Sequence, residues 1–412
     1  MRAAERPAFV RKIRRAVGPT ARATIALVQA VALLPFVAIV VAVRPFVLIR
    51  FGVMDASRIG HLCNTGGYLC LRDLNRSGRR TVDLIGCSSI ICNHQLKVMF
   101  ARALHIYPFA QLLSSLMRAC RFWTRGDLHR IKFHFSDLRF LETAAETHLQ
   151  FTEDEHAQGR KLLERLGIPI DASWICLHNR DSAYLDKVQS GLDWTYHGYR
   201  DFDIQSMALC AEELACRGYY VLRMGSATEQ PLVSSNPKVI DYANHIERSE
   251  FADIYLLGNC QFYLGSDSGI FAVSTIFKRP FAFVNFPVPQ TIYSFYHWNS
   301  HPFILKRARH MKSGHMLSLR ELSEAGLATA VHTQSYSAAG IELINNSPEE
   351  ILDLAAEVDD RIKGVWRATQ EDEELQQRFW DLFRQHAPPH HGGEIKARIG
   401  VAFLRKHADL LN

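Results

Sequence analysis

A run of small and polar residues interrupts the stretch "YLGSDSGIFAVSTIFKRP" (Tyr263–Pro280). We expect an apolar strand that ends at Leu264, a polar turn, and a helix from Ile270 to Phe277. The first backbone NH groups of a helix have no partner inside it, and the helix dipole favours negative charge there. The turn therefore predicts capture of a phosphate or diphosphate, although simple capping of the helix would explain the same residues. The candidate phosphate ligands are Ser266, Asp267, Ser268 and Gly269.

Three further segments place polar side chains just beyond apolar strands, "LHNRDSAYLD", "LRMGS" and "IDYA". Arg180 and Arg223 each follow or end a strand, and two guanidinium groups can hold a diphosphate bidentately. Arg223 lies within the apolar "VLRMG", where an unpaired charge would be costly; a surface ion pair is the alternative for each arginine taken singly. Asp241 and Tyr242 of the third segment could face a base or a ribose. The candidate donor-binding residues are His178, Arg180, Asp181, Ser182, Tyr184, Arg223, Gly225, Ser226, Asp241 and Tyr242.

A base for an acceptor hydroxyl is expected near "MDASRIGHL", closer to the amino terminus. Asp55 or His61 could accept the proton, and Arg58 stands between them. The alternative is that Asp55 caps a helix and His61 packs in a core. The sequence does not choose between the two bases.

These candidate residues can lie close together only if the strands that precede them end at the same edge of one sheet. From "SWICLHNRD" to "PFAFVNFP", five short apolar strands alternate with helical or irregular segments, which predicts a doubly wound parallel sheet. Ligands of such sheets bind beyond the carboxyl ends of the strands. Length favours two domains. The predicted organisation is a basic segment 1–22, a hydrophobic segment 23–44, an acceptor-side α/β domain 45–168, a donor-binding α/β domain 169–345 and carboxyl-terminal helices 346–412.

Composition excludes several classes. The hydrophobic share of 48% and the charged share of 22% are those of a globular protein, and no basic patch with interleaved aromatics indicates nucleic acid. Nine scattered cysteines with no C-x-x-C pair indicate reduced thiols in the cytosol. His386 precedes "APPHHGG", which contains His390 and His391; we interpret this stretch as a solvated loop rather than a metal site, and no other metal ligands are predicted.

The segment "ATIALVQAVALLPFVAIVVAV" (Ala23–Val43) has no charge and is long enough to cross a bilayer, which needs about 20 apolar residues. Basic residues stand on both sides of it, and Pro35 would kink a helix at its middle. These features favour a bent helix that dips into one leaflet; a single span and a buried soluble helix are the alternatives. We expect the chain at the cytoplasmic face of the inner membrane.

Taken together, "RIGHL", "CLHNRDSAYL", "YRDFDI", "YYVLRMGS", "VIDYA" and "FYLGSDSGIFAVSTIFKRPFAFVN" resemble a bacterial family of GT-B-type glycosyltransferases associated with surface-polysaccharide synthesis. The resemblance runs from Phe51 to the final "FLRKHADLL". The spacing of His178 and Arg180 is also similar to a motif of fucosyltransferase-like GT-B enzymes, and "GSDSG" to the donor-phosphate loop of heptosyltransferases.

The resemblance implies two Rossmann-like domains that face a cleft, with a nucleotide-sugar donor held by the second domain and an acceptor by the first. It implies no cofactor and no required metal, because the cationic residues would stabilise the departing nucleoside diphosphate. With the hydrophobic segment, it makes a glycan or lipid-linked glycan the expected acceptor. The alternatives are a nucleotide-sugar epimerase or hydrolase of the same fold and a non-catalytic, membrane-attached nucleotide-sugar binding protein.

Overall fold

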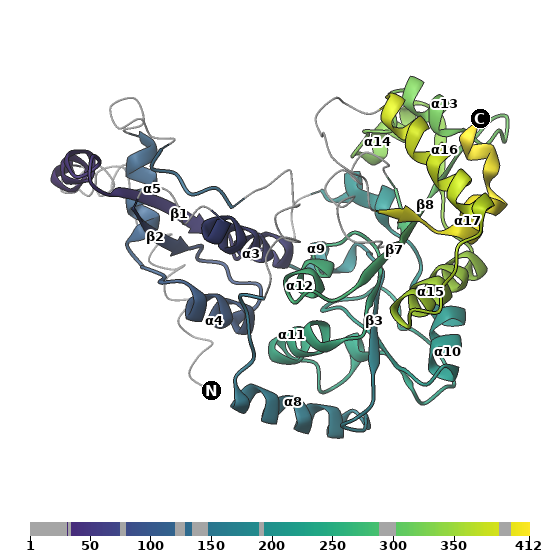
Figure 1. Ribbon diagram of the computed structural model, residues 1–412, viewed down its shortest axis with the longest axis horizontal. Coiled ribbons are helices and arrows are strands. Elements are labelled where there is room, and N and C mark those ends of the chain that lie inside the picture. Colours follow the sequence, from purple (N-terminus) through teal and green to yellow (C-terminus); the bar gives the residue numbers. More distant parts are fainter. Residues whose placement is uncertain are drawn as a thin grey trace. The chain divides into compact units, whose positions relative to one another are not determined.

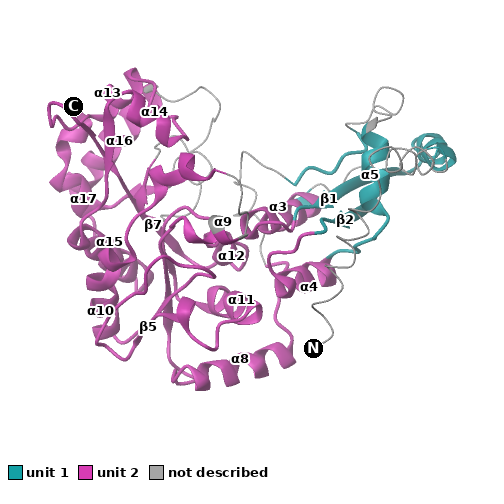
Figure 2. Cartoon of the chain, turned by 180° about the vertical axis from the view of Figure 1, so that it is seen from behind, with its two compact units in different colours: residues 1–55, 74–89, 104–133 teal, residues 56–73, 90–103, 134–412 magenta. Residues whose placement is uncertain are grey.

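The computed structural model describes residues 31, 34–74, 80–119, 128–133, 147–188, 193–287, 302–386 and 397–412 (Figure 1). The chain divides into two compact units (Figure 2). Unit 1 comprises residues 1–55, 74–89 and 104–133, and unit 2 comprises residues 56–73, 90–103 and 134–412. Helix α3 (Ile59–Leu74) and helix α4 (His94–Ala103) therefore belong almost entirely to unit 2, although the sequence places them before the predicted donor domain.

Unit 1 contains two parallel strands, β1 (Leu48–Met54) and β2 (Thr81–Cys87). A bidentate ion pair from Arg50 to Asp83 joins the strands, with N–O distances of 2.7 and 2.8 Å. Helix α5 (Ala110–Ala119) packs on this pair. The described residues of unit 1 thus form a two-stranded sheet with helical cover, which is smaller than the Rossmann-like sheet expected for the first domain.

The predicted hydrophobic segment lies only partly within the described residues. Residues 34–42 form a helix, and Val37 and Val40 are buried in a cluster with Phe51, Leu113, Leu116 and Met117 of unit 1. One face of this helix therefore packs on protein. In the described part of the chain, no helix combines the length and the apolar character that crossing a membrane requires. The basic segment 1–22, most of residues 23–33, and His390 and His391 lie outside the described residues.

Unit 2 is built on a seven-stranded sheet in the order β11-β8-β7-β6-β3-β4-β5, in which every neighbouring pair is parallel (Figure 1). Its strands are β3 (Trp174–His178), β4 (Tyr220–Arg223), β5 (Val239–Ile240), β6 (Tyr263–Gly265), β7 (Phe281–Phe286), β8 (Pro302–Leu305) and β11 (Arg398–Ile399). The predicted parallel sheet is confirmed. The expected five strands lie side by side, and β8 and β11 extend the sheet beyond them.

The order of the strands creates a switch point between β3 and β6. From β3 the chain builds outward through β4 to β5, and then crosses back to place β6 on the other side of β3. Strands β7 and β8 continue in that second direction. In open parallel sheets, the crevice at the carboxyl ends of two such strands is the place where ligands bind.

Helices cover both faces of this sheet. Helices α10 (Ala208–Cys216) and α15 (Pro348–Ile362) lie on one face, and α11 (Glu250–Asn259) and α12 (Phe271–Ile276) on the other (Figure 1). Helix α8 (Glu153–Arg165) packs beside α11 and begins with a capping box between Thr152 and Glu155. Sequence signals explain such starts, because a serine or threonine followed three residues later by glutamate satisfies two free backbone NH groups.

The carboxyl-terminal helices belong to unit 2. Helix α16 (Gln370–His386) and helix α17 (Val401–Lys406) are joined by the ion pair between Asp372 and Arg405. The smaller elements of unit 2 are α9 (Ala183–Val188), the 3₁₀ helices Thr195–Arg200, Ile204–Met207, Tyr242–Asn244 and Ala408–Leu411, the antiparallel pair β9 (Arg307–His310) and β10 (Ile341–Ile344), α13 (Leu319–Glu324) and α14 (Thr333–Ala338).

Candidate functional site

A cavity of about 210 Å³ opens in unit 2 at the carboxyl ends of β3, β4 and β6, which is the switch point of the sheet. The loop before α3 and the start of that helix complete its wall. The lining residues are Arg58, Ile59, Gly60, Cys92, Asn93, His178, Asn179, Arg180, Asp181, Tyr184, His197, Arg200, Gly225, Ser226, Ala227, Arg248, Asp253, Ser268, Gly269 and Ile270. All of them belong to unit 2.

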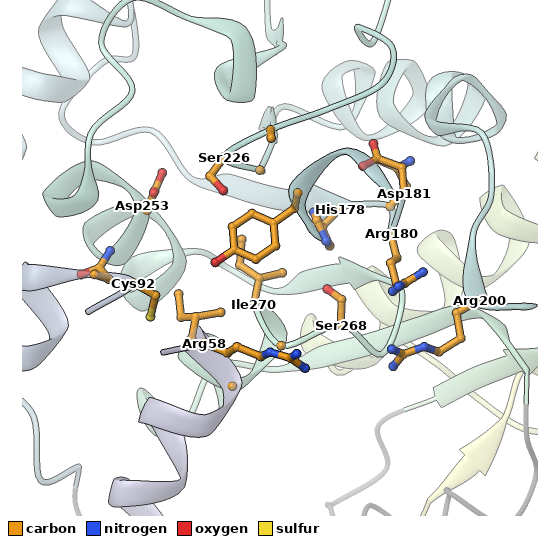
Figure 3. A pocket seen from close by; sticks show the side chains of 18 of the residues that line it. Arg58, Cys92, His178, Arg180, Asp181, Arg200, Ser226, Asp253, Ser268 and Ile270 are labelled. Atoms are coloured by element: carbon orange, nitrogen blue, oxygen red, sulfur yellow. The ribbon is translucent and has the colours of Figure 1, made fainter. Parts of the chain in front are cut away.

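Positive charge dominates the wall of the cavity. Four guanidinium groups, those of Arg58, Arg180, Arg200 and Arg248, face two lining carboxylates. Figure 3 shows Arg58, Arg180 and Arg200 gathered around the hydroxyl of Ser268, with Asp253 and Ser226 at the other end of the cavity. The cavity therefore has a cationic end that suits an anion with several oxygens and a mixed end that suits uncharged polar groups.

Protein contacts hold the guanidinium groups of Arg180 and Arg58. Arg180 is only 7% exposed, pairs with Asp201 and donates to the carbonyl oxygen of His197 at 3.2 Å. Burial lowers the pKa of Arg180 despite that carboxylate. Arg58 lies over the ring of Trp194, 4.9 Å from its centroid. Such fixed cations need little reorganisation when an anion arrives.

Arg200 is less tightly held. Its nearest carboxylate is that of Asp267, 4.0 Å away. It follows a turn of aromatic residues in the 3₁₀ helix Thr195–Arg200, where the ring of His197 lies 3.9 Å from that of Tyr196. His197 Nδ1 is buried and makes no hydrogen bond to a described residue. Burial and the nearby arginines lower the pKa of His197 to about 4, so its imidazole is neutral at pH 7.

The "GSDSG" loop lies at the cationic end of the cavity. The sequence suggests that the first NH groups of the following helix bind an anion, but three of them already have backbone partners. The NH groups of Phe271, Ala272 and Val273 bond to the carbonyls three residues earlier, at 3.1–3.3 Å. They close a tight turn before α12, which is shorter than predicted. Ser268 and Gly269 line the cavity, and the buried hydroxyl of Ser268 has no hydrogen-bond partner within the described residues. The side chains of the loop and the arginines, rather than the start of α12, are thus the donors available there.

The two remaining loop residues support this arrangement from behind. The NH of Ser266 donates to the carbonyl of His178 at 3.1 Å, which joins the ends of β6 and β3. Asp267 is largely buried, and burial raises its pKa against the opposing charges of Arg200, Arg180 and Lys306. A Cβ on Gly265 would lie 2.1 Å from the carbonyl oxygen of His178. Only glycine fits where the two strands approach so closely.

His178 presents a defined tautomer to the cavity. Its Nδ1 lies 3.0 Å from the carbonyl oxygen of Met224, and because that oxygen can only accept, Nδ1 carries the hydrogen. Burial lowers the pKa of His178 to about 4, with Arg223 and Arg180 adding to the effect. The imidazole is therefore neutral at pH 7, and its Nε2 can only accept. An acceptor suits a hydroxyl group better than a phosphate oxygen.

Arg223 lies beneath the cavity and does not line it. The residue is 1% exposed, and its Nη2 donates to Asn179 Oδ1 at 3.0 Å. The carboxylates of Asp181 and Asp241 lie 3.7 and 3.5 Å from its guanidinium nitrogens. Arg223 therefore orients Asn179, which does line the cavity, and neutralises two buried acids.

The mixed end of the cavity centres on Asp253 of α11. Its carboxylate accepts from Tyr242 Oη at 3.0 Å and from Arg248 Nη2 at 2.8 Å. Burial raises the pKa of Asp253 to about 6. Arg248 also donates to the carbonyl oxygen of Gly225 at 3.2 Å. This group of hydrogen-bonded side chains can present both donors and acceptors to a ligand.

The predicted residues fall into two main groups, those that line the cavity and those that stand behind its wall. The cavity wall includes Arg58, His178, Arg180, Asp181, Tyr184, Gly225, Ser226, Ser268 and Gly269, and it includes neither Asp55 nor His61. Ser266, Asp267, Arg223, Asp241 and Tyr242 stand behind the wall, and Ser182 bonds to Glu229 at 2.8 Å.

Sequence reasoning missed several lining residues. Arg200, His197, Arg248, Asp253, Asn179 and Asn93 line the cavity without having been assigned a role. Arg200 lies within "YRDFDI" and Asn179 within "CLHNRDSAYL". A search for every arginine in the segments that carry the resemblance would have found Arg200. Arg248 and Asp253 carry no such signal, because they depend on how α11 packs.

No protein-family model and no curated protein matches this sequence. Among solved structures, it is similar to the ADP-heptose LPS heptosyltransferase II of E. coli, at 12% identity and a TM-score of 0.42 over 76% of this chain and 99% of that chain. It is also similar to a glycosyl transferase family 9 protein of Veillonella parvula, at 10% identity and a TM-score of 0.36 over 57% and 80% of the two chains. The wall teichoic acid polymerase TagF gives 14% identity and a TM-score of 0.26 over 68% and 57%. These three neighbours are thus two glycosyltransferases and a polymerase. With TM-scores this low, the functional inference rests on the cavity.

Proposed function

We propose that this chain is a glycosyltransferase that takes a sugar from a nucleotide-sugar donor bound in the cavity of unit 2. The observation that carries the proposal is the cluster of Arg58, Arg180 and Arg200 around the Ser268 hydroxyl at the switch point of a parallel sheet. A diphosphate is the common metabolite group with enough charge and oxygens to engage three guanidinium groups.

We assign a part of the donor to each end of the cavity. The diphosphate would lie at the cationic end. A neutral His178 can accept a hydrogen bond from a hydroxyl of the ribose or the sugar. The nucleoside would extend toward Asp253, Arg248 and Ser226, where a carboxylate can accept from hydroxyl or amino groups.

Transfer then needs stabilisation of the leaving group. An acceptor hydroxyl attacks the anomeric carbon, the bond from that carbon to the diphosphate oxygen breaks, and the nucleoside diphosphate leaves with the electron pair. Charge builds up on the diphosphate in the transition state, and the fixed guanidinium groups oppose it without requiring a metal ion. The proton of the acceptor goes to a base, for which Asp55 and His61 remain the candidates from the sequence.

We also propose that the acceptor is a lipid-linked glycan of a surface polysaccharide and that the enzyme works at the cytoplasmic face of the inner membrane. The support is the uncharged segment Ala23–Val43 with basic residues on both sides. In the described part of this region, Leu34, Ile39 and Phe46 are 44%, 56% and 79% exposed. Exposed apolar side chains beside basic residues suit an anionic lipid surface. Flotation of the full-length protein with vesicles that contain phosphatidylglycerol, compared with neutral vesicles, tests this part.

Calorimetry of the detergent-purified full chain against UDP, GDP, ADP, dTDP and CMP, each with and without EDTA, tests the donor site. Selective binding of one nucleotide that persists in EDTA is the expected result, and Arg200→Gln should weaken it. The exposed Arg309→Gln is the matched control, because Arg309 pairs with Glu342 on β10, away from the lining residues. If folded protein binds no nucleotide, the proposal is wrong. Turnover of a bound donor without any acceptor would instead indicate an epimerase or a hydrolase, and binding without turnover would indicate a non-catalytic protein.

A further inference from the structure

A second, much smaller cavity of about 20 Å³ lies at the other end of helix α3 from Arg58 and Gly60. Its wall is formed by Gly66, Cys70, Thr147, His148, Leu149, Thr275, Ile276 and Lys278, all from unit 2. None of these residues lines the large cavity. The volume suits a water-sized molecule.

Cys70 and His148, which line this cavity, and Asp73, which does not, form a thiol, imidazole and carboxylate series. Cys70 Sγ lies 3.8 Å from His148 Nδ1, and His148 Nε2 lies 2.7 Å from Asp73 Oδ2. Cys70 and Asp73 are three residues apart on α3, so they lie on one face of the helix. The carboxylate can only accept, so Nε2 of a neutral His148 carries the hydrogen and Nδ1 is left to accept the thiol proton. This is a nucleophile with a base, and the base is held by a third group.

The charges around the thiol define how it could react. Burial raises the pKa of Cys70, whereas the charge of Lys278 lowers it and that of Asp73 raises it. The sulfur is therefore a protonated thiol at pH 7, and it becomes a nucleophile only as its proton passes to His148. Lys278 adopts a left-handed backbone conformation, with a φ of 55°, at the end of α12. Its ammonium group can stabilise negative charge that forms on Cys70.

Other buried thiols in unit 2 have different surroundings. Cys176, Cys210 and Cys260 donate to backbone carbonyl oxygens at 3.6, 3.1 and 3.3 Å. A carbonyl oxygen cannot take up a proton at neutral pH, so these thiols gain no base. Burial raises the pKa of each of the first two. Cys70 differs from these three thiols because an imidazole lies beside it, and we expect this imidazole to make the Cys70 thiol more reactive.

We propose that Cys70 is an oxidation site for a small peroxide, with His148 as its base and Asp73 as the positioning residue. The sulfur attacks one oxygen of hydrogen peroxide and the O–O bond breaks. The thiol proton, carried by His148, goes to the departing oxygen, which leaves as water. The sulfur loses two electrons and becomes a sulfenic acid, and the peroxide is reduced by the same two electrons. The cavity has room for an oxidant about as small as hydrogen peroxide.

The test treats the full-length protein with hydrogen peroxide at pH 7, traps sulfenic acid with dimedone, and measures each cysteine peptide by mass spectrometry. Cys63, buried on the same helix, and the exposed Cys216 are internal controls. We expect Cys70 to be trapped at least about tenfold faster than either, because general base catalysis contributes about 10² to 10⁴. Equal rates at Cys70 and Cys63 would overturn the proposal.

Two variants distinguish base catalysis by His148 from simple accessibility of the Cys70 thiol. His148→Gln should slow trapping at Cys70 to about the rate at Cys63, and His156→Gln, a partly buried control nearby in the sequence, should not. Asp73→Asn should slow trapping less and change its pH profile, since it alters the tautomer rather than removing the base. A His148→Gln protein that folds, by circular dichroism, yet reacts as fast as the wild type would also overturn the proposal. The readout involves no nucleotide, so it stands or falls separately from the glycosyltransferase assignment.

Discussion

Gly60 and Gly269 meet backbone to backbone. A Cβ added to Gly269 would lie 3.0 Å from the Gly60 nitrogen, and one added to Gly60 would lie 3.0 Å from the Gly269 Cα. The first glycine is the second residue of α3, two residues after Arg58, and the second closes the "GSDSG" loop after Ser268. This contact sets the distance between the guanidinium of one segment and the hydroxyl of the other. The cationic end of the cavity therefore depends on two residues that have no side chain.

Replacing Gly269 by alanine should push these two segments apart. The added Cβ meets backbone atoms, which cannot rotate away, so a shift of a few tenths of an ångström is expected. Overpacking of this kind costs about 1–3 kcal/mol of stability, and we expect nucleoside diphosphate affinity to fall by about tenfold or more because the bidentate geometry is lost. Gly198→Ala is the matched control, because its nearest neighbour would be 3.7 Å away. Calorimetry and thermal melting of both variants measure the effects. Unchanged affinity in Gly269→Ala would show that the spacing does not matter for binding.

Arg200→Gln should weaken donor binding with little loss of stability. Its guanidinium lines the cavity, and its nearest carboxylate, that of Asp267, is at the long distance of 4.0 Å. Hydrogen bonds to charged groups contribute about 1.5–3 kcal/mol, or about 10- to 100-fold in affinity. Arg180→Gln should also destabilise the fold, because Asp201 would lose its buried partner. Calorimetry measures the affinity of the two variants for the donor nucleotide, and urea unfolding measures their stability. Equal losses of stability in Arg200→Gln and Arg180→Gln would contradict this account.

The sequence predicts the sheet of unit 2 well because its strands are buried and short. Apolar runs that end in polar residues mark β3, β4, β5, β6 and β7, and the rule that ligands bind at the carboxyl ends then places His178, Arg180 and Ser268 together. Strand β11 has only two residues and offers no pattern to recognise. Its place at the edge of the sheet comes from pairing with β8, which is a long-range contact.

The missed site residues are those that tertiary packing brings in. Arg200 comes from a 3₁₀ helix of aromatic residues, and Arg248 from the turn before α11. Neither follows a strand, so no local rule assigns them to the cavity.

Arg223 shows the opposite case. Its charge within an apolar strand correctly indicated a buried, purposeful arginine, but its contacts are with Asn179, Asp181 and Asp241. A sequence indicates that a buried charge must be compensated and does not say which partner compensates it.

Stability should fall in acid partly because His178 must become protonated. Its pKa is about 4 in the folded state and near 6.5 in the unfolded chain. Below pH 6.5 the unfolded state binds more protons, so the stabilisation from neutral His178 is present above that pH and is lost as pH falls toward 4. Asp253, whose pKa is raised to about 6, acts in the opposite direction between pH 4 and 6. The effect of His178 must therefore be measured as a difference between variants.

His178→Asn removes the titrating ring while its amide can still donate to Met224. We expect the free energy of unfolding of this variant to depend less steeply on pH between 6.5 and 4, by up to about 1.4 kcal/mol per pH unit. Urea unfolding at several pH values measures the slope. His105→Asn, at an exposed histidine, is the control for loss of a surface imidazole. Parallel curves for His178→Asn and the wild type would show that His178 is not a buried neutral group.

Lys306 should make donor binding sensitive to mild alkali. Burial lowers its pKa to about 8, and its ammonium donates to the carbonyl oxygen of Asp201 at 2.8 Å, beside the partner of Arg180. Protonated Lys306 adds positive charge behind the cationic end, and this charge disappears as pH rises through 8. Affinity for a nucleoside diphosphate should therefore decline between pH 7.5 and 9 in the wild type, since a bound anion favours the protonated amine. Lys306→Met should bind more weakly at pH 7 and show a flatter profile, and Lys363→Met, at the C-cap residue of α15, should behave like the wild type. A wild-type affinity that is constant across this range would mean that the ammonium of Lys306 does not act on the bound donor.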